Sequence, residues 1–142
     1  MRSTLRFLVL ALPVAALVLG AVDATAAALG LGPDTAPLAA RGVARVVPLG
    51  RGLELAAILF EATALVAFYL LVARPGRSPL LDGLAAGFAA WLFRGPLLVL
   101  AVATLTRLPT EPFWQLARVG LASLPAAGLA IGAVARLRPL PP

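Results

Sequence analysis

The sequence predicts an all-α integral membrane protein: a four-transmembrane-helix up-down bundle that forms a single domain of 142 residues. Apolar residues make up 61% of the chain and the mean hydropathy is +0.99, which is more apolar surface than a soluble domain of this length can bury. Four apolar stretches reach about 20 residues, the length that crosses the hydrocarbon core of a bilayer. Short turns separate the last three stretches, which favours antiparallel neighbours.

The predicted spans are residues 7–29, 53–73, 80–105 and 113–135. Proline lies inside three of them and is expected to kink the helix there, because it cannot donate a backbone hydrogen bond; these residues are Pro13, Pro96 and Pro125. The turns at residues 74–79 and 107–112 are rich in proline and arginine and are too short for a soluble catalytic module.

The connection between the first two spans is longer. Asp34 is a candidate helix cap, and Arg41 and Arg45 are four residues apart, so that they share one face of a helix. The pattern over residues 37–47 therefore predicts a short helix lying at the membrane interface, with an ordered loop as the alternative.

The first span has two interpretations. Arg2 and Arg6, an apolar run and the small residues around Ala26 are typical of a cleaved secretory signal. The apolar run continues past Ala26 to spanning length, which favours a retained transmembrane helix.

Twelve arginines, no lysine and six acidic residues give a formal charge of +6. The arginines are spread along the chain, mostly at the ends of apolar runs, so they indicate membrane anchors and not a nucleic-acid surface. With the N-terminus inside, six arginines lie on the cytoplasmic side (2, 6, 74, 77, 136 and 138) and four outside (41, 45, 51 and 107). This bias predicts a multi-pass protein of the cell membrane with both termini cytoplasmic. The arginine-only, alanine-rich composition is typical of a GC-rich bacterial coding sequence, which indicates a bacterial inner membrane.

Charged residues within a span are costly in lipid and are expected to face the helix bundle and find partners. Glu61 and Arg94 lie near the middle of two antiparallel neighbouring spans, at similar depth. They are predicted to form an intramembrane charged pair. Such a pair can fix helix register, serve an ion or proton relay, or be completed by a partner subunit.

Small residues predict close helix packing. Gly83 and Gly87 share a face with Arg94, and this stripe is predicted to meet the face of the second span that carries Glu61. Gly128 and Gly132 form a second helix-packing motif.

Asp23, Glu54 and Arg118 are predicted to form a charged cluster in the outer half of the bundle, with Asp23 or Glu54 pairing with Arg118. The charges within the spans would then nearly balance.

The chain has no His and no Cys, which removes the usual ligands for zinc, haem, copper and iron–sulfur clusters and the usual catalytic triads. We therefore expect no metal, no cofactor and no catalytic residues. The sequence favours an accessory or scaffold subunit, or a self-associating helix bundle, whose partners are the lipid bilayer and other membrane subunits or a second copy. One alternative is a small ion-coupled transporter that uses Glu61 as its coupling carboxylate. A second is a lipid- or quinone-binding module, suggested by the aromatic residues beside Arg94.

Overall fold

The computed structural model describes residues 2–34, 36–42 and 50–137, and all the regular elements among them are helices. The helices are α1 (Arg2–Ala28), α2 (Ala36–Ala39), α3 (Arg51–Val72), α4 (Pro79–Arg94), α5 (Pro96–Leu105) and α6 (Glu111–Leu137). The predicted all-helical class is thus confirmed. Four stretches are long and apolar enough to cross a membrane: α1, α3, α4 together with α5, and α6.

The prolines in the long helices have different effects. The third stretch is interrupted at Gly95, which is followed by Pro96 as the first residue of α5. Proline suits a first helical position because the amide hydrogen that it lacks would have no partner there. α1 and α6 instead continue through Pro13 and Pro125 as single helices.

The segment between α1 and α3 contains a single helical turn in its described part. The Asp34 Oδ1 atom accepts a hydrogen bond from the Ala36 amide at 2.9 Å, which caps α2. α2 ends at Ala39 and residues 40–42 form a turn, so the predicted interfacial helix over residues 37–47 is not helical there. Residues 43–47 lie outside the described residues.

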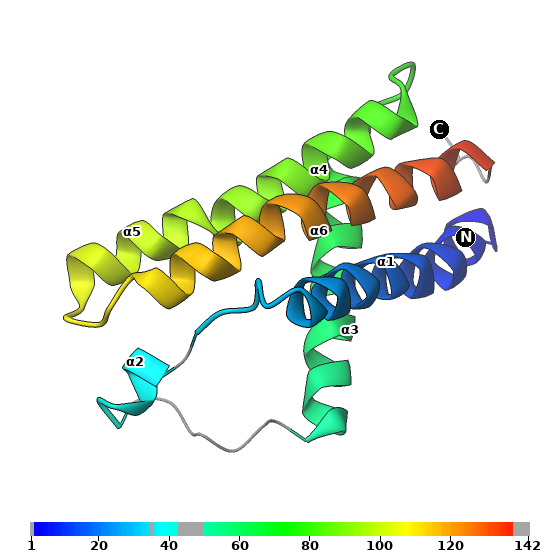
Figure 1. The fold of residues 1–142 in the computed structure, drawn as a ribbon. Coiled ribbons are helices and arrows are strands. Elements are labelled where there is room, and N and C mark those ends of the chain that lie inside the picture. The colour runs from blue at the N-terminus through cyan, green and yellow to red at the C-terminus, as the bar shows by residue number, and fades with distance from the viewer. Residues whose placement is uncertain (1, 35, 43–49, 138–142) are drawn as a thin grey trace.

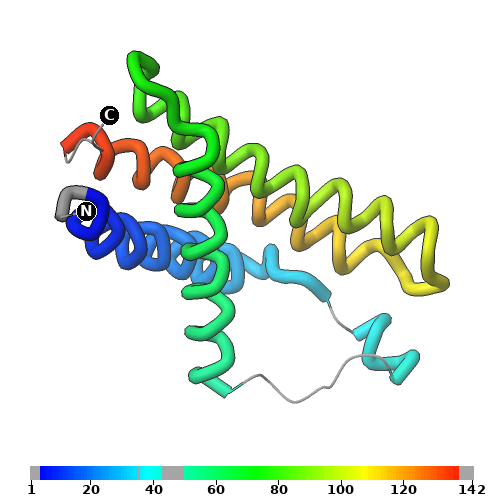
Figure 2. The backbone as a smooth tube through the Cα atoms, turned by 180° about the vertical axis from the view of Figure 1, so that it is seen from behind, coloured from blue at the N-terminus to red at the C-terminus, as the bar shows by residue number. Residues whose placement is uncertain are grey.

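The helices do not all run along one direction (Figure 1). α6 lies antiparallel beside α4 and α5, and α1 runs along the other side of α6, so that the start of α1 and the end of α6 lie at the same end of the molecule (Figures 1 and 2). α3 crosses these helices steeply in both views. A regular up-down bundle therefore does not describe the arrangement of α3.

The crossing has a packing origin. The buried residues of α3 all lie in its second half, from Ala62 to Tyr69. Its first half, residues 51–57, is exposed throughout and extends away from the other helices (Figure 2). α3 is therefore held at one end only.

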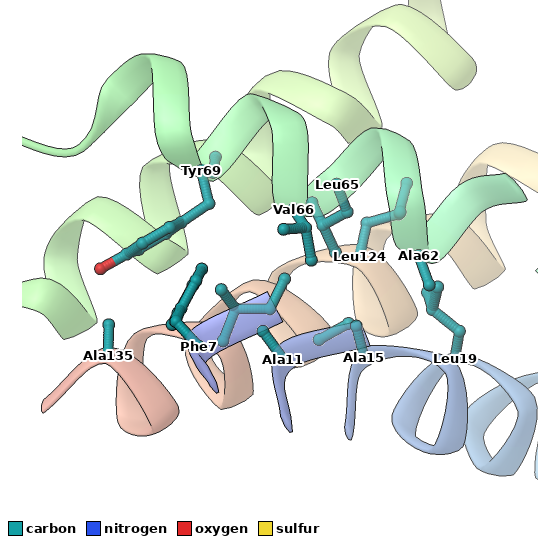
Figure 3. Close-up of a cluster of buried hydrophobic side chains, with 13 residues drawn as sticks. Phe7, Ala11, Ala15, Leu19, Ala62, Leu65, Val66, Tyr69, Leu124 and Ala135 are labelled. Atoms are coloured by element: carbon teal, nitrogen blue, oxygen red, sulfur yellow. The ribbon is translucent and has the colours of Figure 1, made fainter. Parts of the chain in front are cut away.

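The apolar core lies where α1, α3 and α6 meet (Figure 3). Its fully buried side chains include Phe7 and Leu19 from α1, Leu65 from α3 and Ile131 from α6. The rings of Phe7 and Tyr69 pack with centroids 5.8 Å apart. Because α1 supplies a continuous face of this core, it is an integral part of the fold.

Candidate functional site: an ion pair between α3 and α4

Glu61 on α3 and Arg94 at the end of α4 form an ion pair through Glu61 Oε1 and Arg94 Nη1. The two side chains are partly enclosed, with 20% and 32% of their surfaces exposed. Arg94 also lies in the last turn of its helix, where the helix dipole favours a positive charge. The pair joins the crossing helix to the rest of the protein, just before the packed half of α3.

Trp91 and Gly95 fix the position of Arg94. The Trp91 Nε1 atom donates a hydrogen bond to the Ala117 carbonyl of α6 at 2.8 Å. Gly95 is buried, and a Cβ atom there would lie 3.0 Å from the Trp91 carbonyl oxygen and 3.1 Å from the Ala117 Cβ atom. Glycine at this position therefore favours the close approach of the end of α4 to α6, because a larger residue would make tight contacts there.

Asp23 of α1 is the third ionisable group near the pair. It is partly buried and lies within electrostatic range of both Arg94 and Glu61. Two carboxylates and one guanidinium from three helices are thus within electrostatic range of one another, with direct contact between Glu61 and Arg94. The local formal charge is −1, from two acids and one base, and Arg118, the fourth charge of the predicted balance, pairs with Glu111 instead.

A hollow of about 350 Å³ lies beside the ion pair. Its walls come from α3, α4 and α6 and are apolar except for the pair itself: Phe60, Glu61, Ala64, Leu65, Phe68, Ala90, Phe93, Arg94 and Leu124. Phe68 and Phe93 pack with ring centroids 5.8 Å apart. The hollow therefore presents one charged pair to an otherwise aromatic and aliphatic surface.

The predicted outer-half cluster is not assembled. Among the described residues, the ion-pair partner of Arg118 is Glu111, two helical turns earlier on α6, at 3.9 Å. Asp23 lies near Arg94 instead, and Glu54 is on the exposed first half of α3. The steep crossing of α3 accounts for this difference, since it carries Glu54 away from α6.

The four glycines of the predicted packing motifs lie at one interface, but their partners differ from the expectation. Gly83 and Gly87 of α4 face α6, where Gly128 and Gly132 lie, and not α3. A Cβ atom on Gly87 would lie 2.6 Å from the Pro125 Cα atom, far inside normal contact. The glycines therefore bring the α4 and α6 backbones together, and the face of α3 that carries Glu61 has no part in this contact.

Asp82 is a structurally important residue that the sequence analysis did not single out. Its side chain is buried, with the residue 2% exposed, and its Oδ2 atom accepts a hydrogen bond from the Arg74 amide at 3.2 Å. Its Oδ1 atom lies 3.7 Å from Arg77 Nε. Asp82 thus fastens the α3–α4 turn. An acid in the first turn of a helix is a common dipole partner, so the sequence alone gives little sign of this role.

Within residues 2–34, 36–42 and 50–137, no group of three or more His, Cys, Asp or Glu side chains is placed to hold a metal ion. Comparison with known proteins finds no matching family model, no matching curated protein and no matching solved structure.

Proposed function

We propose that the chain is a multi-pass membrane protein with four spans and both termini on the cytoplasmic side. The four long apolar helices support the membrane placement, and the shared end of α1 and α6 fits an even number of spans. The cytoplasmic assignment follows from the greater number of arginines at the end where α1 begins and α6 finishes.

Within that membrane we propose that it acts as an accessory or scaffold subunit, or associates with itself. The observation that carries this proposal is the first half of α3. Leu53 and Leu55 in this half, and Leu59 and Phe60 directly after it, are 54–76% exposed. Residues 51–57 are exposed throughout. A neighbouring helix placed against this segment would complete the packing that α3 lacks on that side.

In this proposal the Glu61–Arg94 pair is a packing device. It lies between the free and the packed halves of α3, and it fixes where α3 crosses α4. Two opposite charges that form an ion pair within the membrane oppose sliding of one helix along the other, because sliding would leave both charges unpaired.

Photo-crosslinking tests the proposal. A photoreactive amino acid at Ala57, in the free half of α3, should yield one stoichiometric protein adduct: a homodimer or one identified membrane protein. The same amino acid at Leu17, an exposed position in the middle of α1, is the matched control and should crosslink mainly to lipid. Lipid adducts alone from both positions would contradict the proposal.

A second candidate is an ion-coupled carrier that uses Glu61. It is favoured by the proximity of Asp23, which leaves one more acid than base beside the 350 Å³ hollow. Reconstituted protein would then show ion flux driven by a pH gradient, and this flux would vanish in Glu61→Gln while the variant remains folded. Absence of flux from the wild-type protein favours the scaffold.

A further inference from the structure

A second cavity lies between the end of α1 and the first half of α6, and it shares no lining residue with the hollow beside the ion pair. Its volume is about 530 Å³, within the range of roughly 300–1,000 Å³ that is usual for ligand sites. Most of its wall is aliphatic, formed by residues such as Val22, Leu29 and Val119. Its polar side chains are Thr25, Gln115 and Arg118.

The cavity exists because α1 and α6 are closely packed at one end only. Phe7, Ala11, Ala15 and Leu19 of α1 are fully buried, whereas the last turns of α1 are mostly exposed. Space therefore opens between the two helices toward Ala28.

The turn after α1 closes part of this space. Gly30 has a φ of 69°, and the Leu31 amide donates to the Ala26 carbonyl at 2.8 Å, an arrangement that ends helices and reverses the chain. Leu31 and Gly32 then line the cavity, and the Asp34 amide donates to Gln115 Oε1 at 2.5 Å. The turn is thus fastened to α6.

The charged group of the cavity is available to a ligand. The Arg118 side chain is 72% exposed, and its described partner Glu111 is itself 60% exposed and 3.9 Å away. Such an exposed, long contact contributes little, so the guanidinium retains donors for an anion. Gln115 uses its oxygen to accept from Asp34, which leaves its amide hydrogens as further donors.

The depth of the cavity in a membrane follows from its neighbours. Trp114, one turn before Arg118, is 43% exposed and is of the residue type that gathers at the headgroup level. The cation thus lies one turn in from the headgroup level, and the part of the wall formed by Val22, Val119 and Ala122 extends from it toward the hydrocarbon.

We propose that this cavity binds an amphiphile with an anionic headgroup: its acyl chain lies between α1 and α6, and its phosphate or carboxylate is bound by Arg118 and Gln115. The chemistry of the wall and its single cation is complementary to such a molecule, which can be a phospholipid or a fatty acid. The inference rests on the membrane placement proposed above. Extraction of membranes with alkaline carbonate tests that placement independently of any lipid binding.

Native mass spectrometry in a nonionic detergent tests the site. Dioleoyl phosphatidylglycerol and oleate should bind as one molecule per chain, and dioleoyl phosphatidylcholine should bind about tenfold more weakly, since a hydrogen bond to a charged group is worth roughly that factor. The tighter of the two anionic ligands identifies the source of the headgroup. Inorganic phosphate at millimolar concentration should not displace either ligand, because it lacks the chain.

Two variants separate the parts of the site. Arg118→Gln should remove the preference for anionic ligands, whereas the control Arg107→Gln, an exposed arginine outside the cavity, should keep it. Ala122→Phe should fill the cavity and weaken the binding of all three lipids by about tenfold or more. Leu121→Phe, at an exposed neighbouring position, should leave their binding unchanged. Circular dichroism establishes that each variant is folded. Equal binding of the anionic and zwitterionic lipids, full displacement by phosphate, or unchanged binding in Arg118→Gln would each overturn the proposal.

Discussion

Gly83 of α4 and Gly128 of α6 face each other so closely that a methyl group on either residue would overlap the backbone carbonyl oxygen of the other. The relationship is reciprocal because the two helices are antiparallel and each presents a glycine at the crossing. Gly132 extends the contact, since a Cβ atom there would lie 3.0 Å from the Leu80 Cα atom. Close backbone approach of this kind allows many dispersion contacts and weak Cα–H···O bonds, which drive association where no hydrophobic effect acts between helices.

Gly83→Ala is therefore expected to destabilise the protein by about 2 kcal/mol, because the backbones must separate to admit the methyl group. The free energy of unfolding in mixed detergent micelles measures this effect. Gly20→Ala is the matched control: its added Cβ atom would meet only the Ile58 Cδ1 atom, at an ordinary 3.6 Å. Gly20→Ala should be neutral or stabilise by up to about 1 kcal/mol, because alanine favours helix. An equal loss in both variants would contradict the assigned interface.

Trp91→Phe should cost about 1 kcal/mol, because it removes the hydrogen bond to the Ala117 carbonyl while it keeps an aromatic ring. The same unfolding measurement applies. Trp114→Phe changes the other tryptophan, which is partly exposed, and should have a smaller effect. If the control costs as much as the test variant, the loss reflects the ring and not the hydrogen bond.

Asp82→Asn should loosen the turn between α3 and α4. The variant weakens the acceptor that binds the Arg74 amide and removes the negative charge next to Arg77, and we expect a loss of about 1–2 kcal/mol. Hydrogen exchange of residues 74–78 should become faster than in the wild-type protein. Asp34→Asn, at the short α2 turn, should leave the exchange of residues 74–78 unchanged. Unaltered exchange in Asp82→Asn would show that Asp82 does not hold the turn.

Cysteine labelling tests the proposed orientation without background, because the chain contains no cysteine. A membrane-impermeant maleimide applied to intact cells should label Gly32→Cys and Arg107→Cys but not Gly76→Cys. Permeabilised cells should show labelling at all three positions. Labelling of Gly76→Cys alone in intact cells would show the opposite orientation. Labelling of Gly32→Cys without labelling of Arg107→Cys would contradict the four-span arrangement.

Much of the fold could be predicted from hydropathy, since a long apolar run in a membrane satisfies its backbone hydrogen bonds by forming a helix. The direction of α3 could not. Its 22 residues are apolar on nearly every side, and the charged ones are only Arg51, Glu54 and Glu61, so no single apolar face indicates which side packs or at what angle. The steep crossing places Glu54 on the exposed half of α3 that extends away from the other helices, and matching residues by depth on aligned helices cannot anticipate this.

The candidate site could likewise be predicted from the sequence only in part. Matching depth on neighbouring spans is enough to suggest Glu61 and Arg94 as partners, because the short turn after α3 limits how far the two helices can shift. The partners of the glycines are ambiguous, since a stripe of small residues fits any other helix that can approach it closely. Asp23 could be matched to either arginine by charge, and only the packing of α1 against α3 and α6 brings it near Arg94.

The most direct test of the central claim, that the Glu61–Arg94 pair holds α3 in place, is a double-mutant cycle on unfolding free energy in a membrane-like environment. Glu61→Leu and Arg94→Leu should each cost about 3 kcal/mol, because each leaves the other charge unpaired among apolar groups. The double variant should recover much of this loss, since neither charge then remains. Losses that simply add in the double variant would contradict the pair as the device that fixes the crossing of α3.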